Sequence, residues 1–181
     1  DRTLIINEIM YEPLQGSAEY IEVMNRSNQD VDLAHWVLQV RGRQTDVGAR
    51  LMLSESKRIL HPGELFVLAS DSGIFRTFPM LEKMDARCME VMKGTDLHLN
   101  NDGGAIIVKD CAGYTIDSVV YQWWWHNPAV VDRKGRSLEK IRPELNSCDA
   151  RSWSTCVAPS GGTPGSLNSI CISVLPSRSR L

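Results

Sequence analysis

The sequence predicts an all-β domain, a sandwich or a barrel, and three observations lead to this prediction. The 181-residue chain contains many apolar runs of strand length in which Ile, Val and aromatic residues recur. Gly, Pro, Asn and Asp separate these runs at short intervals, as tight turns require. No alternation of strands with long helices is visible, which argues against a nucleotide-binding α/β fold.

The first part of the chain contains four predicted strand regions, because β-branched and aromatic residues dominate these runs and turn-forming residues close them. The last region is interrupted by His61-Pro62-Gly63, a tight-turn sequence, so it holds two strands. The regions span residues 3–11, 19–25, 31–42 and 57–70.

The second part of the chain continues the same pattern. Residues 105–121 are predicted as a hairpin around the Asp-Cys-Ala-Gly turn at residues 110–113. Residues 136–143 give a late strand. The only helix-like stretch is short, at residues 71–78, so helices contribute little to the predicted fold.

Composition sets the limits on function. Hydrophobic residues make up 43% of the chain, enough for a core, and the net charge of −2 does not indicate a nucleic-acid partner. No apolar run is long enough to cross a membrane, and no signal peptide is visible. We interpret the chain as a piece of a longer protein, with one domain over residues 1–170 and a linker or a following domain beginning at 171–181.

Two glutamates in the second predicted strand raise the question of a catalytic pair. Side chains alternate across a strand, so Glu19 shares a face with Ile21 and Val23, while Glu22 lies on the opposite face. The two apolar residues are expected in the core, and Glu22 on the outer face. Glu19 and Glu22 therefore cannot form one acid–base pair. Glu8 of the first strand could lie near either of them, as a functional pair or, as we favour, in a structural network.

Known catalytic and metal-binding motifs are absent from the sequence. There is no P-loop and no Gly-x-Ser-x-Gly elbow, and the four histidines are too widely spread for a zinc site. Residues 100–104 (NNDGG) lack the spaced acidic ligands of a calcium loop and are predicted as a turn. Residues 160–165 (SGGTPG) are predicted as an extended segment. We therefore expect no enzymatic activity, no cofactor and no metal.

The five cysteines include one candidate disulfide. Cys148 and Cys156 flank Trp153 in a loop-rich segment, and a bridge between them would close a short loop around this indole. The alternative is that the cysteines are free thiols buried as small apolar residues. The other three are Cys88, Cys111 and Cys171.

Three consecutive tryptophans form the least usual stretch of the chain. In an extended segment Trp123 and Trp125 would lie on one face and Trp124 on the other, so at least one indole is expected at the surface, beside the basic run at residues 133–136. Trp123, Trp124, Trp125 and His126 are therefore a candidate binding patch. The alternative is that the loop folds back and the indoles pack on the protein itself.

The chain resembles the lamin tail domain family in several segments that occur in the family's order. The most specific part is the pattern INEI … EYIEV.N.S … VDL..W.L, and the match covers roughly residues 4–168. The late strand and the TPG…N ending resemble the bacterial, exported members. The matching segments are LIINEIMYEP, EYIEVMNRSNQDVDLAHWVL, HPGELFVLAS, LNNDGGAIIVKDCAGYTIDSVVY, GRSLEKI and SWSTCVAPSGGTPGSLN.

This resemblance implies an immunoglobulin-like β-sandwich with extra strands and loops, and a non-catalytic module. In such a sandwich Trp36 and Leu38 are expected in the core of a central strand, and Val37 on its other face. The family supplies no agreed catalytic residues. Its nuclear members carry a coiled-coil rod; this chain has no heptad segment, so a filament role does not transfer.

Two functions follow as expectations. The first is an interaction or adhesion module of a larger exported bacterial protein, extracellular or at the cell surface or envelope, with a protein or glycan partner and without membrane insertion. The alternative is an accessory domain that binds polysaccharide or nucleic acid for an attached hydrolase, because some relatives adjoin hydrolase or nuclease domains. Since fold does not fix function, the sequences on either side of the chain would separate the two.

Overall fold

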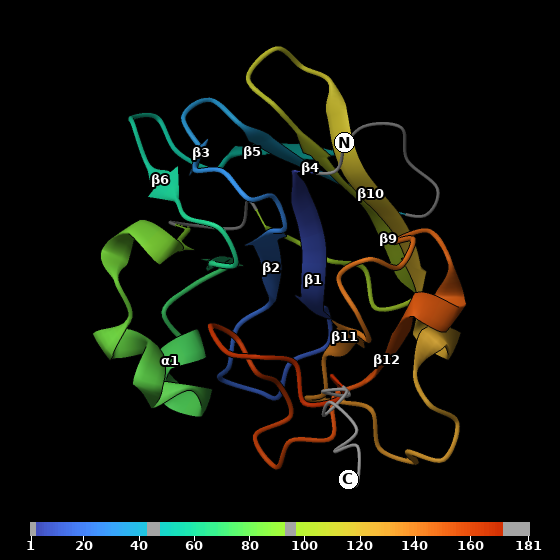
Figure 1. Cartoon of the computed structure of the whole chain (residues 1–181). Helices are drawn as coiled ribbons and strands as arrows, with labels where there is room; N and C mark the ends of the chain where they lie inside the picture. The colour runs from blue at the N-terminus through green and yellow to red at the C-terminus, as the bar shows by residue number, and fades with distance from the viewer. Residues whose placement is uncertain (1–2, 43–47, 93–96, 172–181) are drawn as a thin grey trace, which may run out of the picture.

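The protein is an immunoglobulin-like β-sandwich, as the sequence predicts. The computed structural model describes residues 3–42, 48–92 and 97–171, and Figure 1 shows the two sheets facing each other with short helical segments at the periphery. Neighbouring strands are antiparallel except β7 and β8, which are parallel. The six-stranded sheet has the order β12 (Trp153–Thr155), β11 (Leu138–Lys140), β1 (Leu4–Met10), β2 (Tyr20–Asn25), β7 (Leu65–Ala69), β8 (Met89–Val91).

The second sheet contains the predicted hairpin. Its order is β10 (Thr115–Gln122), β9 (Gly103–Lys109), β4 (Val37–Gly42), β5 (Ala49–Met52), and a separate pair joins β3 (Val31–Asp32) to β6 (Ile59–Leu60). The region at 31–42 is thus two strands, because His35 adopts a positive φ of 62° between them. The helical segments are α1 (Ile74–Thr77), η1 (Pro79–Lys83), η2 (Ala86–Cys88), η3 (Trp123–Trp125) and η4 (Ala150–Ser152).

The main core lies between the two sheets and confirms the predicted facing of several residues. Ile21 and Val23 of β2 point into it, and so do Trp36 and Leu38. Val37, between the last two, lies on the outer face and is half-buried. Strand alternation, read from the sequence, therefore gives the correct inner face for these two strands.

A β-bulge at Asn7 changes the alternation in β1. Ile6 pairs with Val23 and Glu8 pairs with Glu22, so Asn7 is an extra residue between the two pairs. Before the bulge even-numbered side chains enter the main core, and after it odd-numbered ones do: Leu4, Ile6, Ile9 and Tyr11 are all core residues. The bulge therefore turns Glu8 to the outer face of the sheet.

Two segments cover the outer face of the six-stranded sheet. α1 and η1 pack on it through a second apolar cluster that includes Tyr20, Ile74 and Phe78. Residues 160–170, called the strap below, cover the part of this face formed by β1, β2 and β11. The outer face of this sheet is therefore buried beneath these two segments. Figure 1 shows the helical segment and the carboxy-terminal loops on this side of β1 and β2.

The predicted disulfide between Cys148 and Cys156 is not formed, and both thiols are free. The extended strand β12 leads away from Cys148 instead of turning back, because each strand residue advances the chain by about 3.3 Å. Cys148 is exposed, and its Sγ donates to the Ser118 carbonyl at 3.2 Å. Cys156 is buried and its Sγ lies 3.4 Å from Ser169 Oγ. The alternative of uniform burial is also incorrect, since Cys148 and Cys111 are exposed.

Thiol labelling of the folded protein should separate the cysteines by burial. We expect Cys111 and Cys148 to be alkylated quickly, and Cys88 and Cys156 only after unfolding, because burial also raises the pKa of the Cys156 thiol to about 11. Peptide mass spectrometry of labelled, unreduced protein provides the measurement. A peptide pair joined through Cys148 and Cys156 would contradict the structure.

Two adjacent valines of β10 give a matched test of the sandwich. Val119 is fully buried in the core, whereas Val120 is 52% exposed on the outer face. Val119→Ala should lower the free energy of unfolding by about 2 kcal/mol, since it removes buried methyl groups and leaves a cavity. Val120→Ala should change it by less than about 0.5 kcal/mol. Urea denaturation measures both, and equal effects would place this strand in the wrong register.

Candidate functional site

Three buried glutamates lie side by side on the outer face of the six-stranded sheet. Glu8 is directly opposite Glu22 on one side and Glu139 on the other. All three side chains are fully buried. Glu22 is thus on the outer face, as predicted, but this face is not in water. The sequence left open whether Glu8 would lie near Glu19 or near Glu22, and in the structure it lies opposite Glu22. Glu19 instead accepts a hydrogen bond from the Leu99 N–H at 2.8 Å.

Glu8 is held by donors from three parts of the chain. Its Oε1 accepts from Tyr20 Oη at 2.7 Å and from Ser137 Oγ at 2.6 Å, both from neighbouring strand positions. The strap adds the N–H of Thr163 at 2.9 Å. Thr163 Oγ1 lies 3.4 Å from Glu8 Oε2 and 2.7 Å from Glu139 Oε1, so this hydroxyl bridges the two carboxyl groups.

The strap supplies partners to the other two glutamates as well. Glu22 Oε2 accepts from the N–H of Gly165 at 2.6 Å. Glu139 Oε2 accepts from Ser169 Oγ at 2.8 Å and from the N–H of Ile170 at 3.1 Å. Each of the three carboxyl groups therefore binds the strap, and the strap is fastened to the sheet mainly through polar contacts.

Asn168 anchors the strap at the bulge. Its Nδ2 donates to the Asn7 carbonyl at 3.1 Å and to the Lys140 carbonyl at 2.8 Å. Asn7 in turn donates through Nδ2 to Glu22 Oε1 at 2.8 Å and to Asn168 Oδ1 at 3.0 Å. The backbone groups that the bulge removes from the strand ladder thus gain side-chain partners, as buried polar groups require.

Burial changes the protonation of this network. Desolvation raises the pKa of Glu8 to about 7, against hydrogen bonds from Ser137 and Tyr20 that lower it. The pKa of Glu22 is also well above its ordinary value, first because of burial and then because Glu8 is so near. The same causes raise the pKa of Tyr20. The network therefore favours retention of protons that the same groups would lose in water.

This arrangement has the character of a structural network. A general acid or base needs hydrogen-bond access to a substrate, whereas these carboxyl oxygens face strap and sheet donors. Within residues 3–42, 48–92 and 97–171, no group of three His, Cys, Asp or Glu side chains has the geometry of a metal site. The structural alternative for Glu8 is thus the one that the hydrogen-bond geometry supports.

The sequence did contain a signal for the strap, although it was predicted only as an extended segment. A Cβ on Gly162 would lie 2.2 Å from Tyr20 Oη, so only glycine lets the backbone approach the glutamates this closely. Gly161 has a φ of 80°, and a Cβ there would meet the Gly135 carbonyl at 1.9 Å. The adjacent glycines therefore mark a close backbone approach.

The structure separates the four residues of the predicted binding patch. η3 is a 3₁₀ turn, not an extended segment, and it leaves Trp123 40% and Trp124 50% exposed. Trp125 is half-buried and packs against the main core. His126 is buried, and its Nδ1 lies 2.9 Å from Thr155 Oγ1. His126 therefore cannot contribute to a surface patch, which corrects that part of the hypothesis.

The two exposed indoles are held in defined positions. Trp123 and Trp124 meet edge to face, with their ring centroids 5.8 Å apart. The guanidinium carbon of Arg133 lies 4.6 Å from the Trp123 ring centroid, a cation–π contact. Burial, together with the nearby Arg133, lowers the pKa of His126 to about 4, so this buried imidazole is neutral near pH 7. We call Trp123, Trp124 and Arg133 the tryptophan patch.

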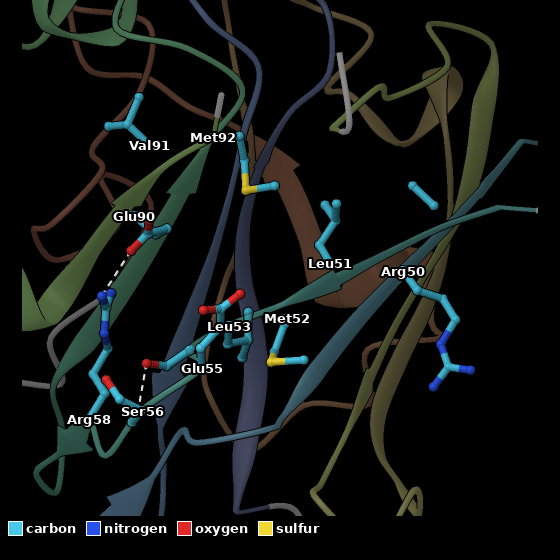
Figure 2. A pocket seen from close by; sticks show the side chains of 12 residues that line it. Arg50, Leu51, Met52, Leu53, Glu55, Ser56, Arg58, Glu90, Val91 and Met92 are labelled. Atoms are coloured by element: carbon cyan, nitrogen blue, oxygen red, sulfur yellow. Dashed lines mark hydrogen bonds and ion pairs between the residues drawn. The ribbon is translucent and has the colours of Figure 1, made fainter. Parts of the chain in front are cut away.

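A groove opens at the edge of the sandwich between β5 and β8. It has a volume of about 770 Å³, and Figure 2 shows Leu51 and Met92 on its walls and the Arg58–Glu90 ion pair, 2.8 Å long, at one end. Arg58 also donates to the Met89 carbonyl at 3.2 Å, which occupies part of the β8 edge. The groove has a mixed lining and lies away from the three glutamates.

Stability should fall as pH rises from 4.5 to 7. Glu8 has a pKa of about 7 in the folded protein against 4.5 in the unfolded chain, so the folded state binds the proton more tightly. Its stabilising contribution is complete below pH 4.5 and is lost as pH rises through 7, a change on the order of 3 kcal/mol. Urea denaturation across this range measures it.

Glu8→Gln should remove the part of this pH dependence that Glu8 contributes, because the amide keeps the acceptor oxygen and cannot ionise. The raised pKa of Glu22 leaves a pH dependence in the same direction. Glu82→Gln is the matched control, since Glu82 is exposed on η1 and should retain the wild-type profile. A Glu8→Gln variant with an unchanged pH profile would show that the proton is bound elsewhere.

Comparison with known proteins agrees with the geometry. No curated protein sequence matches the chain. No helix in the described residues is long and apolar enough to span a membrane. The family model described as Lamin Tail Domain matches residues 1–122, about two thirds of the 181 residues and the part that ends with β10. With its immunoglobulin-like sandwich, the chain therefore belongs to the lamin tail domain family.

Proposed function

We propose that this chain is a non-catalytic interaction module of a larger exported or cell-surface protein, and that it binds a partner through the tryptophan patch. The observation that carries the proposal is the exposure of Trp123 and Trp124 beside Arg133. Large aromatic side chains and arginine are enriched among residues that dominate binding energy. Because the ring contacts already restrict these side chains, binding would cost little side-chain entropy.

Two further observations support a module without chemistry of its own. The family consists of non-catalytic immunoglobulin-like domains. The three adjacent buried glutamates are engaged by the strap, which is a structural use of groups that could otherwise act as acids or bases. The similarity of the late segments to exported bacterial members supports the proposed location outside the cytoplasm or at the cell envelope.

An accessory domain for polysaccharide binding is the second candidate, and the same tryptophans favour it. Indole faces stack on sugar rings as well as on apolar protein surfaces. Arg133 covers one face of Trp123, which leaves Trp124 as the better stacking platform. If the partner is a glycan, the binding affinity should depend strongly on Trp124 and weakly on salt concentration, since sugar stacking involves no ion pair.

The double variant Trp123→Ala/Trp124→Ala tests the proposal. From a phage-displayed random library, the wild-type chain should select peptides that bind the patch. These peptides should bind the double variant at least about tenfold more weakly than wild type. Its melting temperature should stay close to that of wild type, because both indoles are at the surface. Trp153→Ala is the control, and it should destabilise the fold by about 3–5 kcal/mol, since Trp153 is a core residue.

Affinity electrophoresis in gels containing soluble polysaccharides or duplex DNA separates the alternatives. Retardation of the wild-type chain that disappears in the double variant would favour the accessory domain. A large fall in melting temperature with every selected peptide still bound would show that the tryptophans are structural, and the proposed patch would be wrong.

A further inference from the structure

The two sheets differ in how their outer faces are covered. The helical segment and the strap both lie on the six-stranded sheet. On the outer face of the four-stranded sheet the side chains are exposed or half-buried, with Val120 at 52% and Met52 at 45% exposure. Such a face usually carries mixed polar residues, because it meets water on one side. Among the described residues of this face, the charged ones are all basic.

Strand register brings aliphatic side chains together on this face. Ala105 of β9 lies opposite both Arg41 of β4 and Val120 of β10. Two residues further along β9, Ile107 lies between Gln39 of β4 and Ser118 of β10, and in the row beyond it Val37 of β4 lies opposite Lys109. Val37, Ile107 and Val120, with the smaller Ala105, thus form an apolar strip across three strands. We call this strip, with the basic residues described next, the open sheet face.

The charges on the open sheet face have one sign. Arg41, Arg50 and Lys109 come from three different strands and all belong to the outward-facing set, as their neighbours Val40, Leu51 and Val108 enter the core. The described strands β4, β5, β9 and β10 contain a single acidic residue, Asp117, and it is buried on the inner side, where it bonds the Ile6 N–H. The face therefore combines aliphatic and basic residues with the uncharged Gln39 and Ser118.

We propose that the open sheet face docks a partner protein whose contact surface combines aliphatic and acidic side chains. Charge complementarity favours such a partner, because acidic groups would pair with the three cations around the apolar strip. A second copy of this chain would bring the cations against the same three cations. Single-stranded nucleic acids and sugars are recognised largely by stacking on aromatic rings, and the described residues of this face include none.

This inference rests on the proposed interaction function and adds a second surface to it. The groove between β5 and β8 borders the same region, since Arg50 and Met52 line it as well as belonging to β5. Figure 2 shows these two residues at the β5 side of the groove. A partner seated on the open sheet face could therefore extend over the β5 edge without disturbing the strap.

The experiment uses a phage-displayed library of random twelve-residue peptides and the whole 181-residue chain. Selected sequences should be enriched in Asp, Glu and aliphatic residues. Resynthesised peptides should bind Arg41→Glu/Lys109→Glu at least about tenfold more weakly than wild type, and Val120→Ser several-fold more weakly. Arg142→Glu is the charge-matched control, because Arg142 is exposed beyond β11 on the other sheet. Circular dichroism and melting temperature verify that each variant folds.

A charge exchange makes the test specific. Peptides in which Asp and Glu are replaced by Lys should regain affinity for the Arg41→Glu/Lys109→Glu variant, a rescue that a merely destabilised protein could not give. Peptides that respond only to Trp123→Ala/Trp124→Ala would overturn this inference and leave the proposed function standing. An absence of any enriched peptide would count against both. Binding of a duplex DNA probe that requires Arg41 and Lys109 would overturn the assignment of a protein partner.

Discussion

One extra residue in the first strand determines much of this structure. Without the bulge at Asn7, Glu8 would follow Ile6 into the apolar core, where a carboxyl group would lack partners. With the bulge, Glu8 turns outward and meets Glu22 across the strand pair. The outer face of the sheet then carries a row of carboxyl groups that only a polar cover can satisfy. The strap provides that cover, so its position follows from an irregularity at the other end of the chain.

The bulge is also bound from inside the sandwich. The N–H of Ile6 donates to Asp117 Oδ2 at 2.9 Å, and Asp117 belongs to β10 in the opposite sheet. Ser147 donates to the same oxygen at 2.6 Å and contacts the buried Lys140. Buried polar groups that are held by hydrogen bonds in this way define a register more than they add to stability. The two sheets and the strap are therefore aligned by one irregular position in β1.

Local alternation predicted the inner faces of β2 and β4 and the hairpin of β9 and β10, because each of these strands buries one face in the main core. The short edge strands β5, β8 and β12 were missed, since three or four residues give no clear period. The spacing Leu4, Ile6, Ile9, Tyr11 did contain the bulge as a change of phase. The burial of Glu22 had no local signal, because it depends on residues more than a hundred positions away.

The hydrogen bond between the Thr163 N–H and Glu8 joins residues 155 positions apart, and the Asn7–Asn168 contact joins residues 161 apart. Contacts of such sequence separation form late and slow folding. During synthesis on the ribosome, β1 and β2 emerge early, when Glu8 and Glu22 still lack the donors of the strap. This domain can reach its native state only after residue 170 has left the exit tunnel, so until then a nascent chain exposes a sheet face that a chaperone could occupy.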